Sequence, residues 1–373
     1  MKRLLLLLTM PPPVHGVTVI NQQIVNLPGL RDDFAEVRLI PLSFNSGIHL
    51  MEKISLSKLL LFGRVLLRLC LSFFFWRKQY VLLSPALKGA GLFRDALMIV
   101  LLRMGGATII HHIHGRGVME GRTSLVHRLV YRYIFRKSYV ICLSELLLGD
   151  VIPYVERERV FIVPNGIPDP YGDSDLDMAM AARRGRKKPR ILFLSTMMIE
   201  KGPLILLQAL KYLKDKSIAF EAVFAGHFFT NLSERSFLDR AREMGLQDAV
   251  SCIQGVYGHD RDALYLDSDI FVFPTMREAF GLVAIEAMAA ALPLVASDEG
   301  SLPEIVLHGK TGFVFPKGDA GVLACHLEAL CKSPEKRIAF GRDGRERYLA
   351  EYSGEAFSRH MLAALRQACQ QQV

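Results

Sequence analysis

The sequence predicts an α/β protein with two domains, each built on a doubly wound parallel sheet. The chain has 373 residues, which is too many for one ordinary hydrophobic core. Two continuous apolar runs, residues 3–10 and 190–197, each lead into a turn-forming loop. Such runs are typical of strands in a parallel sheet that helices cover on both faces. Because the same opening occurs in each half, we expect one such sheet in each half.

Shorter apolar runs, separated by helical patterns, extend each expected sheet. They span residues 37–41, 80–84, 107–111, 140–143 and 160–163 in the first half, and 220–225, 250–253, 270–273 and 294–297 in the second. We expect the domains to span residues 1–168 and 189–354. Residues 169–188 are polar, charged and rich in turn formers, so they are expected to be a linker.

Charge is distributed unevenly along the chain. Residues 1–160 carry a net charge of +11 and residues 161–373 a net charge of −2. A positive domain attracts anionic lipids, phosphorylated acceptors or nucleic acid. Nucleic-acid binding usually places aromatic side chains among the basic ones. Here the aromatic residues 73–76 lie in an apolar helical stretch, which favours lipid over nucleic acid.

Two segments resemble membrane-targeting sequences. Residues 1–10 place Lys2 and Arg3 before five leucines, but this short run meets proline and has no cleavage site, so we interpret it as a strand. Residues 59–76 contain Arg64 and Arg68, each of which costs about 2.5–3.5 kcal/mol at a bilayer centre. We therefore expect this segment to lie on a membrane surface rather than to cross the membrane. The alternative is an ordinary helix that covers the sheet.

A second basic feature favours the membrane surface. In the helical pattern over residues 122–137, Arg128, Arg132 and Arg136 recur every four residues on one face. Apolar area together with a basic stripe is how interfacial helices bind anionic lipid. The six cysteines form no CxxC pair and no zinc-binding spacing, which fits a reducing cytosol. These features predict a cytoplasmic protein associated peripherally with the cytoplasmic membrane.

The strongest chemical signal lies between residues 273 and 312. A strand ends near Phe273, a loop follows, and a helix opens near residues 280–282. Glu278 stands at the mouth of this helix and Glu286 lies inside it, roughly 12 Å apart at helical rise. The free amides and positive dipole of a helix N-terminus suit a diphosphate. Two carboxylates could then hold hydroxyl groups at each end of that anion. The alternative is a plain helix with one N-terminal acid and one solvated glutamate.

This Glu-x7-Glu segment resembles the retaining GT-B glycosyltransferases of the group 1, family 4 type, a class found in bacterial cell-surface polysaccharide and glycolipid synthesis. Further similar segments are residues 164–167, 224–226, 269–274, 303–306 and 309–313. The resemblance is dense in the second half of the chain and restricted to isolated points in the first. It implies two Rossmann-like domains facing across a cleft. We also expect a helix at residues 355–373 to pack back on the first domain.

The resemblance implies an activity and its partners. The chain would move a sugar from a UDP- or GDP-linked donor to a lipid-linked or glycan acceptor, with retention and without metal or cofactor. Glu286 would bind ribose hydroxyls and Glu278 the donor sugar. The stretch Phe280, Gly281, Leu282 and Val283 would hold phosphate through its amides, and Lys201 would neutralise the diphosphate. Thr196 stands where the family often has an arginine; whether Arg277 or Arg116 replaces that charge is left open.

The remaining candidates rest on the same resemblance. Gly16, in a proline and glycine loop after the first strand, resembles the glycine that faces the donor phosphates, and Gly226 resembles the glycine at a strand end. His114 resembles the strand-end histidine near the transferred sugar. His111 and His112 lie on opposite faces of a strand with no acidic cluster nearby, so we interpret them as structural rather than metal-binding.

Several alternatives remain open. Residues 173–175 and 267–269 read Asp-Ser-Asp, which resembles a metal-binding Asp-x-Asp, but the first lies in the expected linker and the second begins a strand. We therefore predict no metal site. The rival functions are a sugar-nucleotide epimerase of the same fold and a non-catalytic basic protein that binds a membrane surface. The donor sugar, the acceptor and the oligomeric state do not follow from the sequence.

Overall fold

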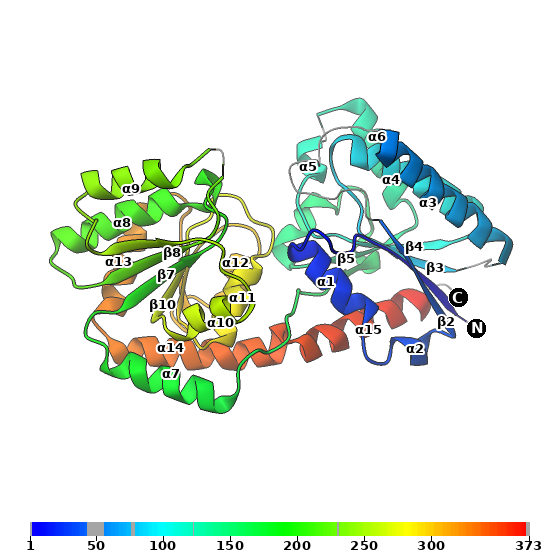
Figure 1. Cartoon of the computed structure of the whole chain (residues 1–373). Coiled ribbons are helices and arrows are strands. Elements are labelled where there is room, and N and C mark those ends of the chain that lie inside the picture. The colour runs from blue at the N-terminus through cyan, green and yellow to red at the C-terminus, as the bar shows by residue number, and fades with distance from the viewer. Residues whose placement is uncertain (1, 43–55, 76–78, 122, 230, 371–373) are drawn as a thin grey trace. The chain divides into compact units, whose positions relative to one another are not determined.

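The computed structural model describes residues 2–42, 56–75, 79–121, 123–229 and 231–370, which form two compact units. The first unit comprises residues 1–165 and 354–373, and the second comprises residues 166–353. Each unit contains one parallel six-stranded sheet with helices on both faces (Figure 1). The predicted doubly wound α/β fold is therefore confirmed.

In the first unit the strand order is β2-β1-β3-β4-β5-β6. The strands are β1 (Arg3–Leu8), β2 (Glu36–Pro41), β3 (Tyr80–Leu83), β4 (Thr108–His112), β5 (Tyr139–Cys142) and β6 (Val160–Ile162). Helices α1 (Gly16–Val25), α2 (Leu30–Asp33) and α15 (Gly354–Gln370) lie on one face, and α3 (Leu56–Phe75), α4 (Gly89–Met104) and α6 (Leu125–Phe135) on the other (Figure 1). The leucines at positions 4–8 are all buried, as a strand covered on both faces requires.

The last helix belongs to the first unit. The hydroxyl of Tyr80 donates to the carbonyl of Cys369 over 3.2 Å. Nε of Arg366 lies 2.8 Å from a carboxylate oxygen of Asp33. Helix α15 thus packs on the first sheet, although the chain reaches it only after completing the second unit.

In the second unit the strand order is β12-β11-β10-β7-β8-β9. The strands are β7 (Arg190–Leu194), β8 (Glu221–Ala225), β9 (Val250–Ile253), β10 (Ile270–Phe273), β11 (Leu294–Ser297) and β12 (Gly312–Phe315). Helices α8 (Pro203–Asp215), α9 (Glu234–Glu243) and α13 (Ala320–Cys331) cover one face, and α7 (Asp173–Gly185), α10 (Gly258–Leu266), α11 (Leu282–Ala289) and α14 (Pro334–Arg347) the other (Figure 1). Strands β7 and β10 are neighbours, so the loops that follow them meet at one edge of the sheet.

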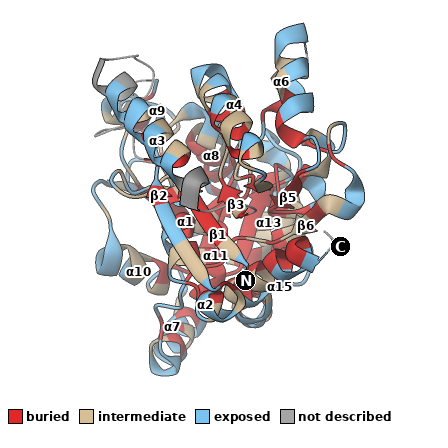
Figure 2. Cartoon of the chain, turned by 90° about the vertical axis from the view of Figure 1, so that its right-hand side faces the viewer, coloured by how far each residue is buried: buried red, intermediate tan, exposed pale blue. Residues whose placement is uncertain are grey.

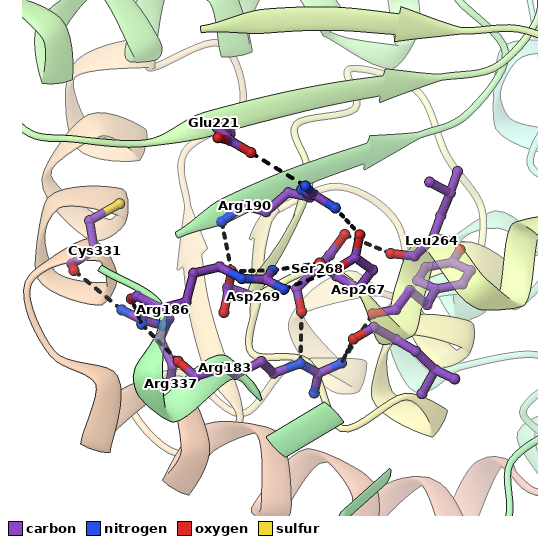
Figure 3. Close-up of polar contacts among 12 residues, drawn as sticks. Arg183, Arg186, Arg190, Glu221, Leu264, Asp267, Ser268, Asp269, Cys331 and Arg337 are labelled. Carbon is purple, nitrogen blue, oxygen red and sulfur yellow. Dashed lines mark hydrogen bonds and ion pairs between the residues drawn. The ribbon is translucent and has the colours of Figure 1, made fainter. Parts of the chain in front are cut away.

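The structure differs from the expected linker at residues 169–188. Most of this segment is helix α7, which belongs to the second unit. Its buried residues are Leu176, Ala179 and Arg183, one of which is charged. The Arg183 guanidinium donates to the carbonyl of Ser268 at 2.7 Å (Figure 3). It also donates to the carbonyl of Ala290 at 2.9 Å. The segment reads as polar because an arginine occupies a position where a helix usually buries an apolar residue.

The surface of the first unit exposes apolar side chains on its helices. In α3, Val65 and Leu69 are buried, whereas Leu67 and Leu71 are 60% and 50% exposed. Figure 2 shows exposed residues along α3, α4 and α6. Helix α6 begins at Leu125, later than predicted, and Arg136 is its C-terminal cap. Residues 76 and 122 of the predicted surface segments lie outside the described residues. None of the described helices combines the length and the apolar character needed to cross a membrane.

Candidate active site

The opening of α11 is shaped by a glycine. Gly281 is the N-cap residue and has φ of 92°, a left-handed conformation that favours glycine. Phe280, next to it, is buried with its ring centroid 6.2 Å from that of Tyr352. The first amides of a helix have no partner within the helix. The predicted residues Phe280, Gly281, Leu282 and Val283 thus occupy the helix opening, where amides can hold an anion.

Lys201 and Glu278 form an ion pair at this opening. The Nζ of Lys201 lies 2.8 Å from Oε2 of Glu278, and both side chains are about one-quarter exposed or less. Lys201 ends the short helix η4 (Ile199–Lys201) after β7, and Glu278 lies in the loop after β10. The amide of Met276 donates to the carbonyl of Glu200 over 2.8 Å, which ties the two loops together.

Close packing of these loops depends on Gly202. It has φ of 81°, and a Cβ at this position would lie 2.0 Å from the carbonyl oxygen of Pro274. A side chain would therefore force the β7 loop away from the β10 loop. Glycine at this position explains how Lys201 reaches Glu278.

Glu286 is held by two residues of α10. Arg261 Nη1 donates to Oε1 over 2.9 Å, and the hydroxyl of Tyr265 donates to Oε2 over 2.8 Å. Burial raises the pKa of Glu286 above its ordinary value, while Arg261 and Tyr265 act in the opposite direction. The carboxylate is thus oriented by two donors and keeps further lone pairs for a ligand.

Arg261 and Tyr265 were not predicted from the sequence. They are four residues apart on α10, so they share one face of that helix. That spacing could have marked them as a pair, but only the fold shows that the pair faces Glu286. The hydroxyl of Tyr171 donates to the carbonyl of Asp262 over 3.2 Å, which anchors the same helix.

The remaining candidates of the second unit lie at or near this edge. Gly226 directly follows β8, and its amide donates to the carbonyl of Ile253 over 2.9 Å. Thr196 is exposed just after β7 and supplies no charge. Arg277 is exposed on the loop that carries Glu278, and its carbonyl lies 3.5 Å from Nζ of Lys201. Arg116 belongs to the first unit.

In the first unit, Gly16 begins α1 directly after the N-cap residue His15. The amide of His15 donates to Oγ1 of Thr18 over 2.9 Å, and Thr18 Oγ1 donates to the carbonyl of Pro13 over 3.1 Å. Nδ2 of Asn21 donates to the carbonyl of Thr9 over 2.9 Å. These bonds fix the glycine loop against the end of β1.

The three clustered histidines have different surroundings. His114 follows β4, with its ring centroid 4.0 Å from that of His112 and its buried Nε2 without a hydrogen-bond partner in the described part of the chain. Burial lowers the pKa of His114 to about 3, and the charge of His15 acts in the same direction. Burial also lowers the pKa of His112 well below its ordinary value. Nε2 of His111 lies 2.9 Å from the carbonyl of Ile134, and burial lowers its pKa to about 4. All three rings are uncharged at neutral pH.

The Asp-x-Asp sequences are engaged by arginines and backbone. Asp267 and Asp269 pair with Arg186 at 2.9 Å each, and the backbone amide of Arg190 donates to Asp269 over 2.7 Å (Figure 3). Oδ2 of Asp175 accepts from the amide of Gly172 over 3.0 Å. Within the described ranges, no group of three or more His, Cys, Asp or Glu side chains is placed to hold a metal ion.

Comparison with known proteins finds a family that is similar to most of the second unit. Residues 180–347 match the family described as "Glycosyl transferases group 1". D-inositol 3-phosphate glycosyltransferase of Corynebacterium kroppenstedtii is 30% identical over 175 residues, which cover 46% of this chain and 39% of that protein. The capsular polysaccharide biosynthesis glycosyltransferase CapM of Staphylococcus aureus is 28% identical over 156 residues, covering 42% of this chain and 40% of CapM. The match thus spans less than half the length of these two relatives.

The fold is similar over the whole chain. The crystal structure of HepE from Anabaena in complex with UDP superposes with a TM-score of 0.73 and 18% sequence identity, covering 98% of this chain and all of HepE. At this identity the likeness concerns the fold alone. Residues 180–347 therefore match the group 1 glycosyltransferases, and the chain has the GT-B fold.

Proposed function

We propose that this chain transfers a sugar from a UDP- or GDP-linked donor to a lipid-linked or glycan acceptor. The observation that carries the proposal is the grouping at the opening of α11. There Lys201 pairs with Glu278, and Glu286 is held by two donors from α10. The complexes of HepE with UDP and with UDP-glucose support a nucleotide-sugar donor, and the polysaccharide role in the name of CapM supports a glycan product.

In the proposed mechanism, charge develops on the leaving diphosphate as the bond from the anomeric carbon to its oxygen breaks. The Lys201 ammonium and the amides that open α11 stabilise that charge, an effect of the oxyanion-hole kind. Glu278 binds hydroxyls of the donor sugar and Glu286 binds those of the ribose. From the first unit, we propose Gly16 for the donor phosphates and uncharged His114 for a hydroxyl of the transferred sugar.

We further propose that the anomeric configuration is retained. Both carboxylates are engaged, Glu278 by Lys201 and by the amide of Ala279, and Glu286 by Arg261 and Tyr265. Such carboxylates suit hydroxyl binding better than nucleophilic attack. The acceptor oxygen would bond to the anomeric carbon on the face that the diphosphate leaves, and its proton would pass to a phosphate oxygen. The NMR coupling constant at the anomeric proton of the product tests this step.

A membrane surface is the proposed site of action. Exposed leucines on α3 lie among the exposed Arg64 and Arg68, and exposed Leu125 and Leu129 on α6 lie beside Arg128 and Arg132. Interfacial helices bind anionic lipid through this combination of apolar area and basic charge. A peripheral position at the cytoplasmic membrane would give the enzyme access to a lipid-linked acceptor.

A donor screen tests the proposed function. Uridine-, guanosine- and adenosine-diphosphate sugars are compared by thermal shift, since a ligand at a hundred times its Kd stabilises the protein by about 2.7 kcal/mol. The stabilising donor is then incubated with and without a lipid extract. We expect a glycosylated product only with the extract. Release of free nucleotide without such a product would favour the epimerase, and no stabilisation by any donor would contradict both enzymes.

A further inference from the structure

A cavity lies in the first unit at the edge of the sheet opposite the carboxyl ends of its strands. Its volume is about 450 Å³. It is lined by Arg103 in the last turn of α4, by residues 106–109 leading into β4, and by Tyr133, Arg136 and Lys137 at the end of α6. The candidate active-site residues Gly16 and His114 follow the other ends of β1 and β4, so this cavity is separate from them.

Arg103 forms the fixed wall of the cavity. Its Nη2 donates to the carbonyl of Ile134 and to Oγ of Ser138, each over 3.0 Å, and its guanidinium also bonds the carbonyls of Tyr133 and Arg136. The guanidinium carbon lies 4.8 Å from the centroid of the Tyr133 ring. These contacts hold the charge of Arg103 at the C-terminal end of α6, where a cation is favourable.

The cavity gathers positive charge without a compensating acid. Arg103, Arg136 and Lys137 line it, and none of its lining side chains is acidic. Within the described part of the chain, neither Arg136 nor Lys137 forms an ion pair, whereas Lys88 pairs with Glu120 and Arg157 with Glu145 in the same unit. Burial lowers the pKa of Arg103, and the charge of Arg136 lowers it as well. A bound anion would relieve this repulsion between like charges.

Apolar side chains surround the basic cavity. Met104, next to Arg103, is 79% exposed, and Leu125, Leu129 and Tyr133 form an exposed line along α6 that ends at the cavity. Exposed apolar side chains do not stabilise a soluble anion, whereas a phospholipid carries acyl chains next to its phosphate. The combination therefore favours a lipid over a free ion.

We propose that Arg103, Arg136 and Lys137 form a binding site for the phosphate of an anionic phospholipid headgroup. Arg103 supplies a fixed charge, and Arg136 and Lys137 close on the phosphate from the rim. This inference rests on the membrane association proposed above and adds a specific lipid site to it. It concerns neither the donor nor the sugar transfer.

The test removes the two rim charges and keeps Arg103. In the variant Arg136→Gln/Lys137→Asn, asparagine suits residue 137 because its φ is 52°. The control Arg157→Gln/Arg159→Gln removes the same charge from arginines that pair with Glu145 and Glu156. Short-chain phosphatidylglycerol, kept below its critical micelle concentration, should raise the Tm of the wild type and the control but not of the variant. An equal rise in all three proteins would overturn the proposal.

Two further arms identify the ligand. At constant ionic strength, inorganic phosphate should raise the Tm less than the short-chain lipid does; an equal rise would assign the cavity to free phosphate instead. In co-sedimentation, the variant should lose more affinity for phosphatidylglycerol vesicles than the roughly thirtyfold that the loss of two basic residues causes at any anionic surface. Its loss of affinity should be much smaller for vesicles of equal charge that contain oleate. Equal losses of affinity for the two kinds of vesicle would mean that the variant has lost only general charge attraction. The Tm measurement with short-chain lipid tests the cavity even if none of the proteins binds vesicles. The donor screen tests sugar transfer separately.

Discussion

The ammonium nitrogen of Lys201 lies 2.8 Å from a carboxylate oxygen of Glu278, although the two residues are 77 positions apart. This ion pair joins the loop after β7 to the loop after β10 at the opening of α11. Any anion bound at the amides of α11 would lie next to a cation that Glu278 already orients. The pair therefore links the proposed phosphate contact to the proposed sugar contact.

The first prediction concerns this pair. Lys201→Ala should lower kcat about a hundred- to a thousandfold, because one preorganised charge stabiliser of the leaving group is lost. Glu278→Gln should lower kcat less, since the glutamine amide keeps one acceptor oxygen for the sugar. Lys211→Ala is the matched control, because Lys211 lies on α8 and pairs with Asp215. Full activity of Lys201→Ala, measured by nucleotide release with saturating donor, would contradict the assignment.

The second prediction concerns the support of Glu286. Tyr265→Phe removes one hydrogen bond to the carboxylate and leaves the ring in place. We expect the KM for the donor to rise about three- to tenfold with a smaller change in kcat, because a single hydrogen bond contributes about 0.5–1.5 kcal/mol. Tyr212→Phe, in an exposed tyrosine of α8, should leave both constants unchanged. A fall in kcat without a change in KM would show that Tyr265 acts on the chemical step instead.

The third prediction concerns acid stability. His112 is fully buried, and its pKa in the folded state lies well below the ordinary value of 6.5. The unfolded chain therefore binds a proton there below pH 6.5 that the folded chain does not bind. Stability from this group is fully present above pH 6.5 and is lost as the pH falls below it. Denaturant unfolding of His112→Leu, compared with wild type between pH 7 and about pH 5, should show up to one proton fewer taken up on unfolding. Parallel pH profiles for the two proteins would contradict the prediction.

The fourth prediction is that sugar transfer does not depend on a divalent metal. In the proposed mechanism, the charge on the diphosphate is neutralised by Lys201 and the helix amides. Activity should therefore survive EDTA at a concentration that exceeds any carried-over metal. Complete loss in EDTA, with recovery on addition of Mn²⁺ or Mg²⁺, would contradict it. In that case Asp267→Asn and Asp269→Asn would be the variants to examine next.

The sequence was informative where local pattern decides structure. Continuous apolar runs predicted β1 and β7 because a strand that is covered on both faces must be apolar throughout. The opening of α11 was predicted at residues 280–282 from the loop and glycine that precede it, and the helix begins at Leu282. These features depend on residues that are neighbours in the chain.

Features that depend on distant contacts were not predicted. Helix α7 appeared to be a linker because its buried Arg183 is satisfied by carbonyls of residues 82 or more positions away. Arg261 and Tyr265 reach Glu286 only because α10 and α11 cover the same face of the sheet. Strand β12 was not predicted either; of its four residues only Gly312 and Phe315 are buried. Patterns of neighbouring residues in the sequence do not indicate contacts between segments that are far apart in the chain.

The last prediction is that α3 and α6 bind an anionic membrane surface. Two variants separate the two forces. Arg128→Glu/Arg132→Glu removes basic charge from α6, and each basic residue near the surface adds about 1 kcal/mol of attraction. Leu67→Ser/Leu71→Ser removes apolar area from α3 and leaves its charge unchanged. The two arginines and the two leucines are all exposed, so neither double substitution should lower the stability of the fold.

Co-sedimentation with phosphatidylglycerol vesicles is the measurement. The charge variant should lose at least thirtyfold in affinity at low salt. It should lose little at high salt, because screening has already weakened the attraction of the wild type. The leucine variant should lose affinity at both salt concentrations, since burial of apolar area is not screened. Leu146→Ser, at an exposed leucine elsewhere in the first unit, should bind as the wild type does. Equal binding of wild type to neutral and anionic vesicles would remove the electrostatic part of the proposal. Unchanged binding of the leucine variant would mean that the exposed leucines of α3 do not enter the bilayer, and the basic stripe of α6 would then be the remaining contact.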